Sequence, residues 1–133
     1  MDGYADDATI EGHEVIWRRI PPDQVHWDTN LGRWRPQTGM FADSSDGSPM
    51  SACRANLYPS TDSVLAERGH PHHFLAAVPV GLLRDLGLQV ASLPEIPDDP
   101  GHVWIVGKKT DGIRKRLAKT AEWVVPPPAD PPV

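Results

Sequence analysis

Short apolar runs, separated by glycine and proline, set the hydrophobic pattern of the chain. Residues 13–20 alternate between two sides, and Ile16 and Ile20 share one of them, which predicts a strand that Pro21 and Pro22 end. Further strands are predicted at residues 50–57, 74–80, 88–93 and 103–106. The run at 103–106 (VWIV) is apolar throughout, which is typical of a strand buried on both faces. A sheet of about five strands is therefore expected.

Three short helices are predicted, at residues 62–68, 81–86 and 110–123. Gly69 and Gly87 are expected to end the first two, because glycine readily adopts the left-handed conformation found after a helix. The third carries an apolar stripe at the spacing of one helix face, formed by Ile113, Leu117, Ala121 and Val124. Trp104 in the last strand and Trp123 at the end of this helix are expected in the core. Strands and helices follow one another in mixed order along the chain, which predicts an α+β fold: a small mixed, largely antiparallel sheet with about three short helices.

The 133 residues suit one domain, with different segments at its two ends. Residues 1–12 are polar and acidic and are expected to form a flexible arm, ahead of a single α+β domain at 13–125. Residues 126–133 are rich in proline and are expected to form a disordered tail. Residues 21–49 carry turn chemistry throughout, which predicts a long functional loop that Trp27 and Trp34 pin to the core.

Composition narrows the class of protein. One cysteine, Cys53, excludes an intramolecular disulfide, and its place in a predicted strand indicates a packing role. No apolar run is long enough to span a bilayer, and the opening residues do not resemble a signal peptide, so a cytoplasmic protein is expected. The net charge of −5 argues against a generic nucleic-acid binder.

Two polar motifs suggest binding sites. Residues 107–110 (GKKT) follow a strand and precede a helix, where a phosphate loop would lie. Such a loop needs glycine at position 102, which is His102, so nucleotide hydrolysis of that kind is excluded, while anion binding at the helix start stays open. His70, His72 and His73 lie close together, but no further ligand completes a metal site. We expect exposed histidines and no metal, and a proton shuttle by one imidazole stays open.

Residues 17–90 resemble the RES domain, a family of bacterial toxin enzymes related to ADP-ribosyltransferases. Trp17-Arg18 is similar to the aromatic-arginine start of that family, and Gly32-Arg33-Trp34 is similar to its Gly-Arg-aromatic turn. Residues 60–67 (STDSVLAE) resemble its Ser-x-x-x-Ala-x-x-Glu helix, and residues 74–86 resemble the strand and short helix that follow. The chain as a whole also resembles small proteins of actinobacterial type.

The resemblance implies an enzyme that binds and consumes NAD. Cleavage of the nicotinamide glycosidic bond passes through an oxocarbenium-like state, so the site needs a cation at the pyrophosphate and a carboxylate near the ribose. By the resemblance, Arg18 and Glu67 would be the catalytic pair and would face each other across one cleft. NAD would be held by Arg18, Arg33 and an aromatic wall from Trp34 or Phe41.

A non-catalytic interaction module of a bacterial operon is the alternative, such as an antitoxin, a regulator or an assembly subunit. Basic residues gather on the last predicted helix, at Arg114, Lys115, Arg116 and Lys119. This helix, residues 110–123, and the tail, residues 126–133, are surfaces that can bind a protein partner. The basic face also fits an ordinary solvated helix. Whether Arg18 and Glu67 converge in a cleft distinguishes the enzyme from the module.

Overall fold

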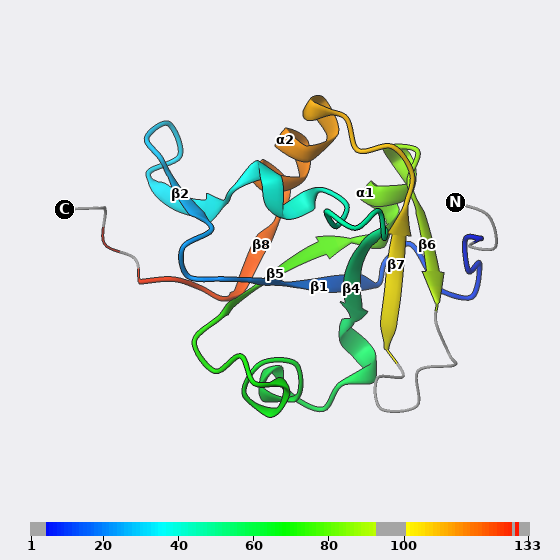
Figure 1. The fold of residues 1–133 in the computed structure, drawn as a ribbon, viewed down its shortest axis with the longest axis horizontal. Coiled ribbons are helices and arrows are strands. Elements are labelled where there is room, and N and C mark those ends of the chain that lie inside the picture. Colours follow the sequence, from blue (N-terminus) through cyan, green and yellow to red (C-terminus); the bar gives the residue numbers. More distant parts are fainter. Residues whose placement is uncertain (1–4, 93–100, 129, 131–133) are drawn as a thin grey trace.

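The computed structural model describes residues 5–92, 101–128 and 130 (Figure 1). The strands are β1 (Val15–Ile20), β2 (Val25–Asp28), β3 (Arg33–Pro36), β4 (Met50–Arg54), β5 (Phe74–Pro79), β6 (Gln89–Ser92), β7 (His102–Val106) and β8 (Glu122–Val125). Within these residues, six strands form one sheet in the order β6-β7-β4-β1-β5-β8, and β2 and β3 form a separate hairpin. Every pairing is antiparallel. The expected α+β fold with a largely antiparallel sheet is confirmed.

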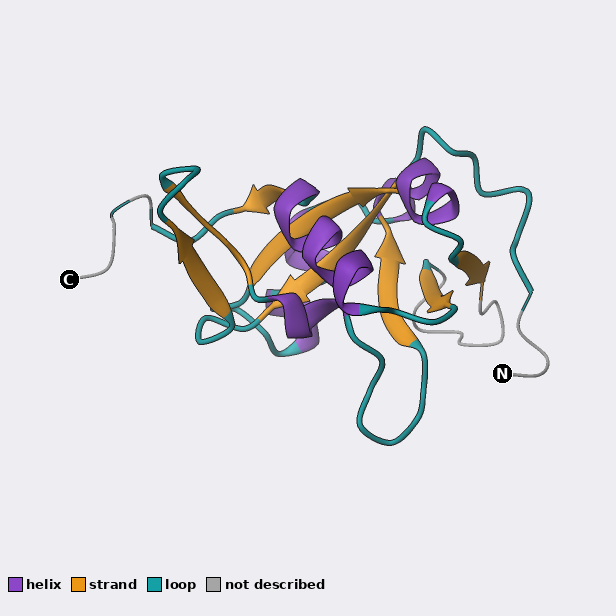
Figure 2. Ribbon diagram, turned by 90° about the horizontal axis from the view of Figure 1, so that it is seen from above, coloured by secondary structure: helices purple, strands orange, loops and turns teal. Residues whose placement is uncertain are grey.

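The helices are short. Two are α-helices, α1 (Val80–Asp85) and α2 (Asp111–Thr120), and the 3-10 turns are η1 (Thr38–Phe41), η2 (Ala55–Leu57), η3 (Thr61–Ser63) and η4 (Ala66–Arg68). Seen from above, helices lie over the central strands (Figure 2). Thr110 caps α2, because its hydroxyl accepts a hydrogen bond from the Ile113 amide.

The central strand β1 divides two hydrophobic clusters. Ile16 and Ile20 are fully buried in the main cluster, together with side chains from η1, α1 and α2. Trp17 lies on the other face and packs against a smaller cluster that includes Cys53 and Leu65. Both faces of the sheet are therefore covered at β1. The predicted packing role of Cys53 agrees with its burial.

Three predictions of local structure are wrong. The last helix stops at Thr120, and residues 122–125 form the edge strand β8, in which Trp123 is half-buried and Val124 is exposed. Residues 62–68 form two separate 3-10 turns, because Leu65 between them leaves the helical region, with φ −111° and ψ −88°. Trp104 is also only half-buried, since Val103 and Ile105 occupy the inward positions of β7.

The stretch at 21–49 contains more structure than the predicted loop. Trp27 and Trp34 face each other across the β2–β3 hairpin, with ring centroids 5.4 Å apart in an edge-to-face arrangement. The buried carboxylate of Asp28 closes the turn by accepting hydrogen bonds from the Leu31 amide and from the Arg35 guanidinium. Residues 25–36 thus form a β-hairpin, and the Trp27–Trp34 pair packs within it.

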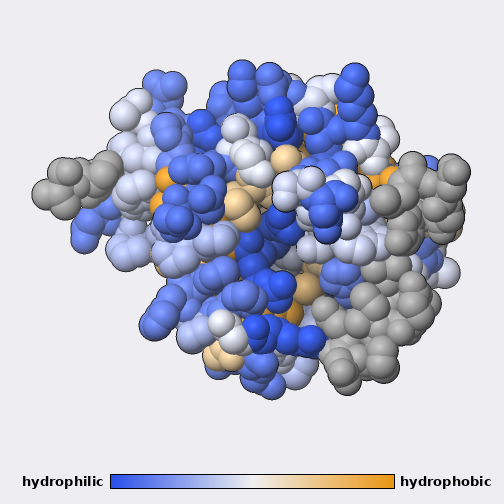
Figure 3. All heavy atoms as spheres, in the orientation of Figure 1, coloured by the Kyte–Doolittle hydropathy of each residue, from blue (hydrophilic) through white to orange (hydrophobic). Residues whose placement is uncertain are grey.

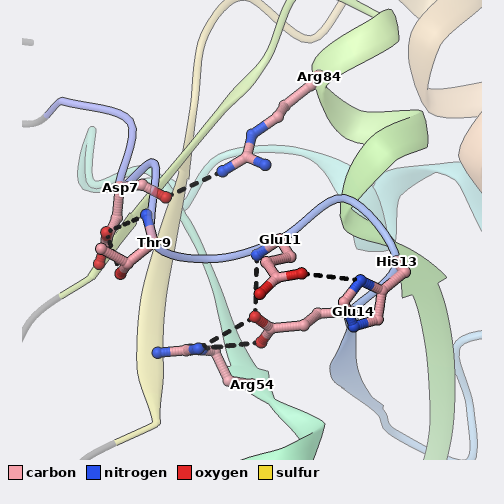
Figure 4. A network of polar contacts seen from close by, with 7 residues as sticks. All are labelled: Asp7, Thr9, Glu11, His13, Glu14, Arg54 and Arg84. Atoms are coloured by element: carbon pink, nitrogen blue, oxygen red, sulfur yellow. Dashed lines mark hydrogen bonds and ion pairs between the residues drawn. The ribbon is translucent and has the colours of Figure 1, made fainter.

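Residues 5–12 do not form the expected flexible arm. Ile10 is fully buried in the main cluster, and the Asp7 amide donates to the carbonyl of Val90. Arg84 donates to the Asp7 carbonyl, while Arg54 forms an ion pair with Glu14 (Figure 4). The Asp6 carboxylate also forms an ion pair with Arg84 at 3.1 Å. The burial of Ile10, the backbone hydrogen bonds and this ion pair are the physical reasons that the segment is fixed.

The described part of the tail, residues 126–128 and 130, also departs from the disorder that its composition predicts. Pro127 is buried, and the Trp34 indole donates to the carbonyl of Asp130 at 2.9 Å. The Trp123 indole donates in turn to the Trp34 carbonyl at 3.0 Å. Two tryptophans therefore bind the start of the tail to the hairpin, whereas residues 131–133 lie outside the described residues.

Truncation of the chain after Val125 is expected to lower the free energy of unfolding by about 1–2 kcal/mol. The truncation removes the hydrogen bond from Trp34 to Asp130 and the buried side chain of Pro127, each of which contributes on the order of 1 kcal/mol. Denaturant unfolding of the full and truncated chains measures the difference. Trp34→Phe keeps an aromatic ring and removes the indole donor, so it should lower the free energy of unfolding by less than the truncation does. An unchanged midpoint after truncation would mean that the tail does not pack on the domain.

Within the described ranges, the structure contains no helix with the length and apolar character that a membrane span requires.

Candidate anion-binding site

A local separation of two strands creates the site. β1 and β4 pair only through Ile16 with Arg54 and Trp17 with Cys53. Beyond this point β1 continues along β5 to Ile20, while β4 continues along β7 to Met50. Figure 1 shows β4 and β7 steeply inclined to β1. The sheet therefore opens between the later half of β1 and the first half of β4, where neither strand has the other as a partner.

The side chain of Arg18 bridges this opening. Its Nη1 donates to the Ser51 carbonyl on β4 at 2.7 Å, and its Nε donates to the Met40 carbonyl on η1 at 3.0 Å. The guanidinium thus donates to a carbonyl of β4 that has no backbone partner on β1. It also fixes η1 against the sheet. These two carbonyls set the direction of the planar group and leave Nη2 without a hydrogen bond among the described residues.

Arg18 is mostly buried and has no carboxylate partner in the described part of the chain. Burial, together with the positive charge of Arg19, lowers the pKa of Arg18 to about 10. The group stays charged at neutral pH. A charge removed from water is costly unless it is paired, so this position favours an anionic partner.

A cavity of about 240 Å³ lies beside this guanidinium. Its polar walls are Arg18 and Arg19 from β1, His70 and His73 from the loop before β5, and His102 from β7. Trp17 and Met40 supply apolar wall, and no aspartate or glutamate lines the cavity among the described residues. Strongly hydrophilic atoms lie near the middle of the face shown in Figure 3. A small cavity with cations and imidazoles and without acids suits one phosphate group or a similar anion.

His70 and His73 form a close pair in this wall, with ring centroids 4.5 Å apart. The Nδ1 atom of His73 is buried and makes no hydrogen bond within the described residues. Burial is the main cause that lowers the pKa of His73, and the charges of His70 and Arg19 act in the same direction. His73 is therefore neutral at pH 7 in the free protein. His72, the third member of the cluster, is exposed and is not part of the wall.

The structure does not bring the residues of the RES-like site together. Arg18 lines the cavity, but Glu67 is exposed on η4 and lies outside the lining. Arg33 and Trp34 lie on β3 and line a separate groove beside the tail. Phe41 is fully buried in the main cluster, so its ring is not accessible as a wall for nicotinamide. Of the expected positions, only Arg18 faces this cavity, so Arg18 and Glu67 do not converge in one cleft as the enzyme would require.

At the start of α2, Lys109 is not available for the anion binding that the sequence left open. The Lys109 ammonium is 3% exposed and forms an ion pair with Asp43 at 2.6 Å. It also donates to the Gly107 carbonyl, so the ammonium is already bound to groups of the protein. Among the described residues no group of three or more histidine, cysteine or acidic side chains is placed to hold a metal ion.

Sequence reasoning missed Arg19, Trp17 and His102 as members of the site. His102 joins the cavity from β7, and no local pattern shows which strands lie beside one another. The GHPHH segment was a usable signal, because Pro71 between histidines indicates a turn that can bring imidazoles together. A second signal was not used: the alternation of residues 13–20 also puts Arg18 on the side of Ile16 and Ile20, which is an unusual position for a charged side chain.

Comparison with protein-family models, with curated proteins and with solved structures finds no match to this chain. The RES resemblance therefore rests on the short motifs alone, and the function must be argued from the geometry of the cavity.

Proposed function

We propose that the cavity beside Arg18 binds a phosphate-bearing nucleotide, and that NAD is the first candidate. The observation that carries the proposal is the mostly buried Arg18 guanidinium, which has no carboxylate partner among the described residues and faces a cavity without acids. A guanidinium held in one plane donates well to phosphate oxygens, because its fork matches their spacing.

The Trp17-Arg18 pair supports NAD in particular. Arg18 is the residue that the RES resemblance assigns to the pyrophosphate, and it is also the residue that the cavity presents. Trp17 lines the same cavity and stacks with Tyr58, at 6.4 Å between ring centroids, so an aromatic surface lies next to the cation. The cavity has room for one phosphate and a neighbouring ring, and the rest of a dinucleotide would extend outside it.

The proposal concerns binding. Cleavage of NAD needs a carboxylate near the ribose, and the described lining has none, since Glu67 lies elsewhere. Consumption of NAD would thus require Glu67 to reach the ligand from η4.

Calorimetric titration of the full chain with NAD and with ADP-ribose tests the proposal. We expect one saturable site for each ligand, because both carry the pyrophosphate that Arg18 would bind. Affinity should weaken as salt rises, because charged contacts are screened. A nucleoside without phosphate, such as adenosine, is the matched control and should not bind measurably. The absence of saturable binding by NAD and ADP-ribose at millimolar concentration would contradict the proposal.

A protein-interaction role is the second candidate, and one observation favours it. Lys115, Arg116 and Lys119 are exposed on α2, and their spacing places them along one side of that helix. Such a surface on an acidic chain would suit an acidic protein partner. Arg116→Gln would weaken such a complex and leave the nucleotide cavity unchanged, so one variant separates the two roles.

A further inference from the structure

The His70–His73 pair adds a second polar group to the cavity that Arg18 faces. Both rings belong to the wall, and their centroids are 4.5 Å apart. His73 has a buried Nδ1 without a hydrogen bond in the described residues, so one of its nitrogens has no partner in the free protein. A buried nitrogen without a partner is unusual, and rotation of the ring would turn it toward the cavity that His73 lines.

We propose that His73 is the second anchor for the anionic group held by Arg18, and that it binds this group as an imidazolium. This inference rests on the proposed function for the identity of the nucleotide, but its chemistry requires only a tetrahedral anion such as phosphate or sulfate. The proton comes from solvent, so binding of the anion takes up one proton. No bond in the ligand is made or broken.

The groups that face His73 explain why the proton arrives only with the ligand. Burial is the main cause that disfavours a positive charge on His73, and His70 on the same loop and Arg19 on β1 act in the same direction. The charge of Asp23 after β1 favours it. The other titratable groups of the cavity wall are Arg18, Cys53 and His102. A bound anion offsets the repulsion from Arg19 and from His70, so the pKa of His73 rises in the complex.

This linkage makes binding depend on pH with a definite sign. His73 is neutral in the free protein and charged in the complex, so the affinity falls as the pH rises. The slope reaches at most about tenfold per pH unit, the value for one proton. ADP-ribose is a suitable probe because its two phosphates do not titrate near neutral pH. His73→Gln removes the titrating group and should abolish this dependence.

Proton NMR of the histidine rings tests the inference directly, with the full chain titrated from pH 5 to pH 8.5. The titration is run in chloride, in sulfate at equal ionic strength, and with saturating ADP-ribose. The His73 signal, assigned by its loss in His73→Gln, should titrate at higher pH with either anion. His72 is exposed and outside the wall, so His72→Gln should bind as the wild type does.

The outcomes separate the two proposals. A His73 titration that does not respond to either anion, while ADP-ribose binds through Arg18, overturns the inference and leaves the proposed function standing. A response of the His73 titration to sulfate, without any binding of ADP-ribose or NAD, supports the inference and contradicts the proposal that the ligand is a nucleotide. If neither anion affects His73 and neither nucleotide binds, both proposals fail.

Discussion

Phe41→Ala is expected to lower the free energy of unfolding by about 3–5 kcal/mol, the usual cost of removing a buried phenylalanine. Phe41 is the last residue of η1 and is fully buried in the cluster that also holds Leu117 of α2. Its removal leaves a cavity between η1 and the rest of the core, which the sheet and α2 cannot close without moving. Because small domains are stable by only about 5–15 kcal/mol, this loss is a large share of the total.

Denaturant unfolding of Phe41→Ala beside Leu57→Ala measures the effect. Leu57 is 42% exposed, so its truncation should change the stability by no more than about 0.5 kcal/mol. Phe41→Leu, which keeps most of the apolar volume, tests the function of the ring at the same time. If Phe41 only packs in the core, the folded Phe41→Leu variant should bind NAD as tightly as the wild type. A marked loss of affinity in that variant would restore Phe41 as a wall of the nucleotide site.

Arg18→Gln is expected to weaken binding of NAD by about 100-fold. Hydrogen bonds from a charged donor contribute about 1.5–3 kcal/mol each, and a hundredfold change in affinity is about 2.7 kcal/mol. Glutamine keeps an amide that can donate to the Ser51 carbonyl, so the bridge between β1 and β4 is partly kept. The variant also removes a poorly solvated charge, and this offsets part of the lost hydrogen bonding in the folded state.

Arg116→Gln is the matched control, because it makes the same change of charge at an exposed position on α2. Calorimetry should show wild-type affinity for Arg116→Gln, and intermediate affinity for Arg18→Lys, which keeps the charge but loses the planar fork. Equal losses in Arg18→Gln and Arg116→Gln would indicate that only the overall charge matters. Wild-type affinity in Arg18→Gln would exclude the cavity as the binding site.

The fold was predictable where local pattern and long-range packing agree. The alternation around Ile16 and the apolar run that became β7 each specify their element within a few residues. β8 was missed because Val124 also fits the helical stripe that ends in Leu117 and Ala121, and four residues do not distinguish this period from the two-residue period of a strand. The β2–β3 hairpin was missed because Arg33 and Arg35 gave its second strand the composition of a loop.

The site was predictable only in part. Arg18 was found because a short motif placed it, and the structure puts its guanidinium at the cavity. The arrangement around it depends on where β1 and β4 separate and on the neighbouring position of β7, and neither is a local property of the sequence. Phe41 and Glu67 were assigned by sequence order alone, and order along the chain does not fix which side chains face one cavity.

A structure of the protein in complex with ADP-ribose is the most direct test of the Arg18 cavity as a nucleotide site. The expected result is a phosphate oxygen about 3 Å from Arg18 Nη2, with the His73 ring facing the same phosphate. A ligand bound in the groove lined by Trp34 and Trp123, with the cavity beside Arg18 unchanged, would contradict the assignment of that cavity as the nucleotide site.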